Sequence, residues 1–83
     1  MTGPVVNGIL EILTNELHLR VPSADTDLLA TGTLDSLGLV ELLVQIELKY
    51  RVRVEMETLD VEDFRTAARI AAYVERIRAG SAA

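Results

Sequence analysis

The 83 residues are enough for one domain with a single core, and a hydrophobic share of 49% is too high for a disordered tail. The absence of cysteine and the presence of a single histidine, His18, exclude a disulfide scaffold, a cysteine nucleophile and the usual zinc sites. The net charge of −5 is concentrated in residues 25–63, which hold ten acids and three bases, and this acidic middle argues against a nucleic-acid partner.

The beginning of the chain predicts a helix from Pro4 to Leu17. Proline is favoured in the first turn of a helix, because its missing N–H would have no partner there. One apolar stripe at helical spacing defines the face that we expect to be buried: Val5, Ile9, Ile12, Leu13 and Leu17.

Residues 19–35 show no helical period and are rich in turn-forming residues, among them Pro22 and Gly32. We therefore expect a long loop between the first two helices, with Leu28 and Leu29 holding its middle against the core. Loops longer than about 12–15 residues are uncommon in compact domains and usually carry function.

A second helix is predicted to begin at Asp35 or Ser36 and to end near Tyr50, because Asp35 is a favourable N-cap residue. The stripe expected to face the core is Leu39, Leu42, Leu43, Ile46 and Tyr50. A second apolar set cannot face the core together with that stripe: Leu37, Val40, Val44 and Leu48. This helix is therefore predicted either to lie deep in the fold or to present an apolar face to a partner.

After the second helix, residues 51–55 alternate in polarity like a strand but have no second strand to pair with, so we expect an extended link. Residues 60–64 predict a short helical turn, and Thr66 is expected to cap a last helix over residues 67–78. The buried side of this last helix is predicted to comprise Ala67, Ile70, Ala71, Val74 and Ile77.

These elements predict an all-α fold, a bundle of three main helices and one short helix with a long loop between the first two. We expect residues 1–83 to form a single domain, with the core at about residues 5–78 and a frayed end at 79–83. No run approaches the roughly 18 apolar residues of a membrane span. The first residues lack the basic flank of a signal peptide, so a cytoplasmic location is expected. We also expect a monomer.

Ser36 follows an acidic residue and opens a helix that leaves a turn-rich loop. Unpaired N–H groups and the helix dipole favour an anion at such a position, so a phosphodiester on the Ser36 hydroxyl would be stabilised. No histidine or lysine lies close in sequence to activate the serine as a nucleophile, which indicates modification by another protein rather than catalysis. The alternative is that Asp35 and Ser36 only cap the helix.

The run from Gly32 to Leu42, Gly-Thr-Leu-Asp-Ser-Leu-Gly-Leu-Val-Glu-Leu, resembles the phosphopantetheine attachment motif of acyl carrier proteins. Asp27-Leu28-Leu29 and Phe64-Arg65-Thr66 also lie where this family has similar features. The resemblance implies a carrier without catalysis of its own. A separate transferase, using magnesium, would attach 4'-phosphopantetheine from coenzyme A to the hydroxyl of Ser36. The thiol of that arm would hold acyl or aminoacyl groups as thioesters.

The resemblance also implies roles for the neighbours of Ser36. Asp35 would help the transferase recognise the carrier and orient the metal. Five residues match helix positions that usually face partner enzymes: Leu37, Val40, Glu41, Val44 and Glu47. Their steps of three and four residues independently place them on one helix face, although single members could instead pack against the loop. The expected partners are the transferase, a loading ligase or acyltransferase, and downstream biosynthetic enzymes.

Three residues depart from the pattern of fatty-acid carriers. Gly38 stands where an acid is common, and Leu48 and Lys49 stand where many of those carriers have acids. The Leu-Asp-Ser-Leu-Gly form is similar to stand-alone carriers of specialised metabolism, such as polyketide and nonribosomal peptide pathways, and to D-alanyl carrier proteins. These departures predict partners other than fatty-acid synthase enzymes.

Two other functions compete with the carrier. A serine esterase family also contains Asp-Ser-Leu, but its fold needs a longer α/β chain and a histidine near the C-terminal end, whereas His18 lies upstream of Ser36. The remaining alternative is an unmodified helical interaction module that docks through the second helix.

Overall fold

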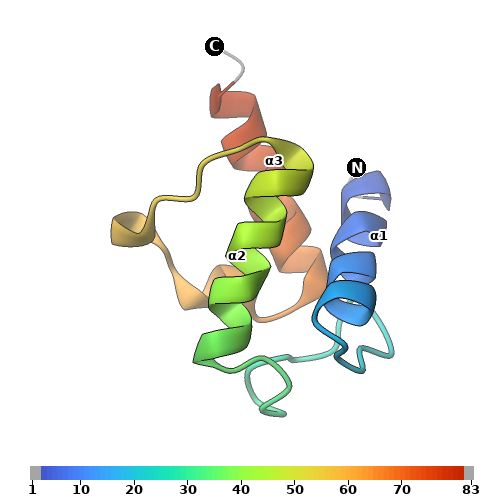
Figure 1. Cartoon of the computed structure of the whole chain (residues 1–83). Coiled ribbons are helices and arrows are strands. Elements are labelled where there is room, and N and C mark those ends of the chain that lie inside the picture. The colour runs from blue at the N-terminus through green and yellow to red at the C-terminus, as the bar shows by residue number, and fades with distance from the viewer. Residues whose placement is uncertain (1–2, 82–83) are drawn as a thin grey trace.

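The computed structural model describes residues 3–81, and this part of the chain consists of helices, turns and loops without a strand (Figure 1). Its helical segments are α1 (Gly3–Glu11), η1 (Ile12–Glu16), α2 (Ser36–Tyr50), η2 (Met56–Thr58), η3 (Val61–Phe64) and α3 (Ala67–Ser81). α1 packs on α3, while α2 contacts both α3 and η1. This is the all-α, acyl-carrier-like bundle that the sequence predicts. Among the described residues, no helix has both the length and the apolar content needed to cross a membrane.

The first helix has the predicted extent but not the predicted form throughout. Its α-helical part ends at Glu11, and a wider π-helical turn, η1, continues to Glu16. The N–H of Leu17 donates to the carbonyl of Ile12 across 3.0 Å. The chain then turns at His18, whose φ of 57° lies in the left-handed region that side-chain-bearing residues rarely adopt.

α2 begins at Ser36 and ends at Tyr50, which confirms both predicted ends. Arg51 closes the helix in a left-handed conformation, with a φ of 55°. Residues 51–55 form the extended link that the alternation predicts, and η2 after them is a short helix that the sequence did not reveal.

The predicted short turn is present as η3, where Asp60 accepts a hydrogen bond from the N–H of Glu62. Thr66 caps α3 through its hydroxyl, which accepts from the N–H of Arg69 across 3.1 Å. α3 continues to Ser81, three residues beyond the predicted end at Arg78. Residues 82 and 83, part of the predicted frayed end, lie outside the described residues.

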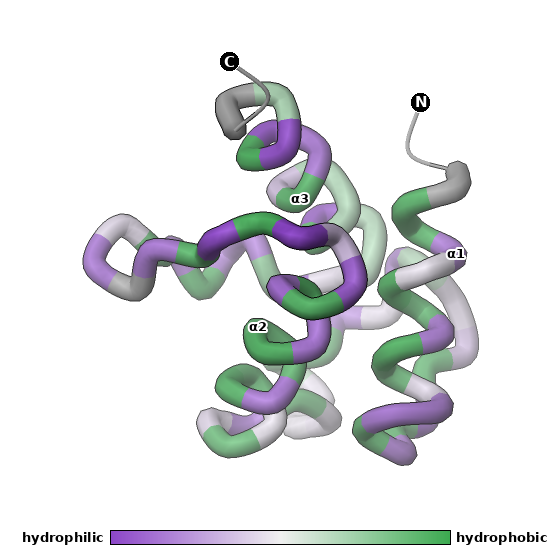
Figure 2. Tube along the Cα trace, turned by 45° about the horizontal axis from the view of Figure 1, so that its top comes forward, coloured by the Kyte–Doolittle hydropathy of each residue, from purple (hydrophilic) through white to green (hydrophobic). Residues whose placement is uncertain are grey.

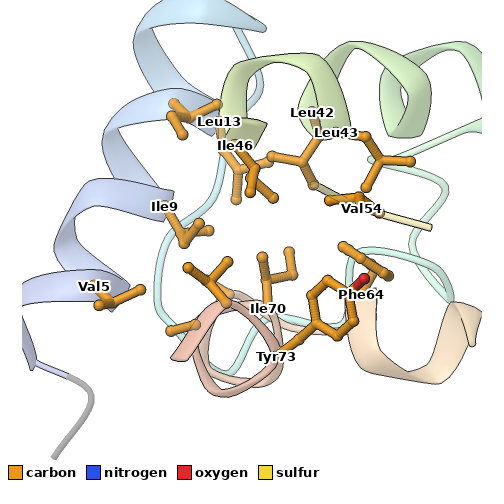
Figure 3. Packing of buried hydrophobic residues seen from close by; sticks show 14 of the residues in the cluster. Val5, Ile9, Leu13, Leu42, Leu43, Ile46, Val54, Phe64, Ile70 and Tyr73 are labelled. Carbon is orange, nitrogen blue, oxygen red and sulfur yellow. The ribbon is translucent and has the colours of Figure 1, made fainter. Parts of the chain in front are cut away.

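The core lies between the helices and is almost entirely aliphatic (Figure 3). Its largest fully buried side chains are Phe64, Ile9, Leu13, Leu28, Leu42, Ile46, Ile70 and Val74. The ring of Tyr73, which was not among the predicted core residues, packs against Phe64 with ring centroids 5.1 Å apart. Leu39, Tyr50 and Ile77 are only half-buried, so the predicted stripes reach the edge of the core.

Candidate functional site

Ser36 is the first residue of α2 and its side chain is exposed. The N-terminal end of α2, where the long loop enters the helix, lies at the bottom of the view in Figure 1. The preceding residue, Asp35, has an extended backbone and caps the helix, with its carboxylate accepting from the N–H of Gly38 across 2.7 Å. One acid therefore fixes the start of the helix while the adjacent serine stays open to solvent.

Hydrogen bonds within residues 27–34 hold the last part of the loop before α2. The carboxylate of Asp27 accepts from the N–H of Leu29 at 3.2 Å and of Ala30 at 2.9 Å, which makes a tight turn. The N–H of Leu34 then donates to the carbonyl of Leu28 across 3.0 Å. Leu34 is buried and stands directly before Asp35, so the turn is connected to the start of α2.

A guanidinium group joins this turn to η3. Arg65 contacts Asp27 at 2.9 Å on one side and Glu62 at 2.7 Å on the other. The carbonyl of Arg65 also accepts from the N–H of Leu28 across 2.7 Å. We call Asp27, Glu62 and Arg65 the loop clamp.

The charges of the loop clamp stabilise one another. The N–H of Ala30, followed by the Arg65 guanidinium, lowers the pKa of Asp27 below its ordinary value. The hydrogen bond from Arg65 lowers the pKa of Glu62, and the two carboxylates raise the pKa of Arg65. All three groups are therefore charged at neutral pH.

The exposed side of α2 carries the surplus apolar residues. Leu37 and Leu48 are 70% and 69% exposed, and Val40 and Val44 are about half exposed. We call these four residues the apolar ridge, since their steps of three and four residues place them on one helix face. Figure 2 shows hydrophobic colour along much of α2, as expected for a helix apolar on two sides. The interpretation that this helix presents an apolar face therefore replaces the alternative that it lies deep in the fold.

The predicted partner-facing residues are not all equivalent. Leu37, Val40, Glu41 and Val44 are exposed. Glu47 is half-buried, and its carboxylate accepts a hydrogen bond from the N–H of Val54 across 2.9 Å. The docking role of Glu47 stays a prediction. Its hydrogen bond to Val54 also holds the link that follows α2.

Comparison with known proteins is consistent with this geometry. A family model described as "Phosphopantetheine attachment site" matches residues 7–74. The D-alanyl carrier proteins of Streptococcus thermophilus and Streptococcus gordonii are each 39% identical over 72 residues, covering 84% of this chain and 90% of the relative. That of Streptococcus equi subsp. equi is 41% identical over 54 residues, covering 65% of this chain and 68% of the relative.

The chain belongs to the acyl carrier protein family, whose members bear a covalently attached 4'-phosphopantetheine. It is thus a carrier and not an enzyme, and the esterase alternative is set aside. The described residues fit such a group, because an exposed hydroxyl lies at the positive end of the 15-residue helix α2.

Proposed function

We propose that the phosphopantetheine arm is attached to the hydroxyl of Ser36 and that the transferase recognises Asp35 beside it. The supporting observation is the position of Ser36 as the exposed first residue of α2. Ser23 is also exposed, but its hydroxyl accepts from the N–H of Asp25 and lies 3.4 Å from the hydroxyl of Thr26 within a surface turn. Ser36 therefore suits an anionic substituent better than Ser23 does.

In the attachment step, the hydroxyl oxygen of Ser36 attacks the phosphorus of coenzyme A that carries the pantetheine. The new O–P bond forms as the phosphoanhydride bond breaks, adenosine 3',5'-bisphosphate leaves, and a base outside this chain takes the serine proton. The resulting phosphodiester carries a negative charge, which the N-terminal end of α2 stabilises by about 0.3–1 kcal/mol. Once attached, the arm supplies a thiol that holds the cargo as a thioester.

The proposed cargo is an aminoacyl group loaded by a dedicated ligase and delivered to a downstream biosynthetic enzyme. Support comes from the relatives, which are named D-alanyl carrier proteins, so D-alanine is the first amino acid to test. A polyketide or nonribosomal peptide pathway remains compatible with the Leu-Asp-Ser-Leu-Gly form of the motif, but these relatives do not favour it. A cytoplasmic monomer stays a prediction.

Partner enzymes are proposed to bind the apolar ridge together with Glu41. The supporting observation is the exposure of four large apolar side chains on one face of the helix that begins at Ser36. Apolar side chains at this density on a small surface are typical of protein interfaces. A partner with an apolar groove and one basic group would match this face.

The attachment is tested by incubating the protein with coenzyme A, magnesium and a broad phosphopantetheinyl transferase, followed by an intact mass measurement. We expect the mass of one phosphopantetheine to be added to the wild type and to a Ser23→Ala control, but not to Ser36→Ala. If an active transferase adds nothing to the wild type, the unmodified interaction module becomes the better account.

A further inference from the structure

The loop clamp is connected to Ser36 through a short series of backbone hydrogen bonds. The carbonyl of Arg65 holds the N–H of Leu28 at 2.7 Å, and the carbonyl of Leu28 holds the N–H of Leu34 at 3.0 Å. Asp35 and Ser36 follow Leu34 directly in the chain. Two hydrogen bonds therefore connect Arg65, at the end of η3, to Leu34, the residue before the N-cap of α2.

Asp27 is the point at which the clamp and the turn meet. Its Oδ1 atom accepts from the N–H groups of Leu29 and Ala30, and its Oδ2 atom lies 2.9 Å from Nη1 of Arg65. A shift of this carboxylate would disturb the ion pair and the turn at the same time. The position of the turn is thus tied to the position of the guanidinium.

Hydrogen bonds restrict the orientation of the Arg65 guanidinium. Its Nε and Nη2 atoms donate to the two carboxylate oxygens of Glu62 at 2.9 and 2.7 Å, while Nη1 donates to Asp27. Such two-pronged contacts fix direction as well as distance, because the guanidinium is planar and rigid. Isolated surface ion pairs are worth little, whereas a shared guanidinium with bidentate geometry is the exception.

Another ion pair that includes a residue of η3 lacks this connection. Arg76 on α3 lies 3.1 Å from Asp63 on η3, and neither residue belongs to the loop before Ser36. This second pair joins α3 to η3, whereas the loop clamp joins the loop to η3. It therefore serves as a matched control for the removal of a surface charge pair.

We propose that Arg65, acting through Asp27, is a positioning residue that fixes the loop at residues 27–35 so that Ser36 is correctly presented to the transferase. The proposal rests on the attachment at Ser36 proposed above. The serine hydroxyl must approach the phosphorus of coenzyme A in line with the breaking bond, and a misplacement of about 1 Å can reduce a rate about a hundredfold. The apolar ridge is untouched by changes at Arg65, so docking should be affected less than the transfer rate.

The test measures kcat and KM of arm transfer with the full-length apo protein as the substrate. For Arg65→Met we expect kcat to fall about tenfold, while KM changes by less than about twofold. Arg65→Lys should recover most of the loss, because an ammonium can still pair with Asp27. Arg76→Met should behave as the wild type.

Asp27→Asn provides a second variant in case Arg65→Met does not fold, which circular dichroism reveals. The Asn oxygen can still accept from Leu29 and Ala30, so the turn is kept while the ion pair is lost. The same fall in kcat is expected. Wild-type kcat in a folded Arg65→Met or in Asp27→Asn, or an equal loss in Arg76→Met, overturns the positioning role.

The two proposals fail in different ways. If the wild type takes up no arm at all, the attachment at Ser36 is overturned and the positioning role with it. If the wild type is modified normally and the clamp variants are modified equally fast, only the positioning role is overturned.

Discussion

The carboxylate of Glu47 on α2 accepts a hydrogen bond from the backbone N–H of Val54 across 2.9 Å. Val54 is 8% exposed, so its N–H lies in a largely buried part of the link between α2 and η2. The side chain of a helical glutamate thus satisfies a backbone donor of a segment that has no strand partner. This contact holds the link against α2.

Removing this contact should destabilise the fold. Glu47→Ala leaves the Val54 N–H without its acceptor, and we expect the free energy of unfolding to fall by about 1–3 kcal/mol in urea titrations. Glu47→Gln keeps an oxygen acceptor and should lose clearly less. Glu41→Ala, on the exposed side of the same helix, is the control and should change stability by less than about 0.5 kcal/mol. An equal loss in the alanine variants of Glu47 and Glu41 would contradict this role.

Shortening the apolar ridge next to Ser36 should weaken docking without unfolding the protein. For Leu37→Ala we expect KM for the transferase to rise about fivefold, which corresponds to about 1 kcal/mol of lost contact. Leu37 is 70% exposed, so stability should stay nearly unchanged. Val61→Ala, which removes an exposed apolar side chain on η3, is the control. A KM unaffected by Leu37→Ala and raised by Val61→Ala would place the docking face elsewhere.

Acidification should weaken the loop clamp. The pKa values of Asp27 and Glu62 are lowered in the folded chain from their ordinary values of 3.8 and 4.5, so the folded state binds fewer protons than the unfolded state. The contribution of the clamp is therefore present above these ordinary values and is lost as the pH falls through the lowered ones. We expect urea titrations between pH 7 and pH 3 to show a smaller acid-induced loss in Arg65→Met than in the wild type. Identical pH profiles of the two proteins would rule out this contribution.

Replacing Arg51, the left-handed residue at the end of α2, with glycine should stabilise the fold. Arg51 has a φ of 55°, a conformation that glycine adopts without steric cost. Arg51→Gly should raise the free energy of unfolding by about 0.5–1 kcal/mol, since the relieved strain exceeds the entropy lost by glycine. Arg53→Gly, two residues further along the extended link, is the control and should not stabilise. A loss of stability in Arg51→Gly would show that the Arg51 side chain contributes more than its backbone strain costs.

The helices could be predicted from the sequence because each carries its own local signal. The stripe through Leu42 and Ile46 and the cap at Asp35 were sufficient to place α2 with both ends. The π-helical turn over Ile12–Glu16 could not be predicted in this way, because the apolar period continues through it unchanged. The turns at His18 and Arg51 lack the glycine that usually marks a left-handed residue.

The candidate site, too, was predictable from the sequence only where the signal is local. Asp35 and Ser36 could be singled out because they are adjacent and sit at a helix start within a recognisable motif. The pairing of Asp27 with Arg65 spans 38 residues and depends on how the loop folds against η3, so no spacing rule indicates it. The contact from Glu47 to Val54 was missed because its helical position also fits an outward-facing residue.

The central claim is that Ser36 bears the arm, and its most direct test is to locate the modification by fragmenting the modified protein in a mass spectrometer. After incubation with coenzyme A, magnesium and a transferase, the phosphopantetheine mass should be found on a peptide containing Ser36. The peptide containing Ser23 should be unmodified. An arm on Ser23, or a chain that an active transferase leaves unmodified, would contradict the account.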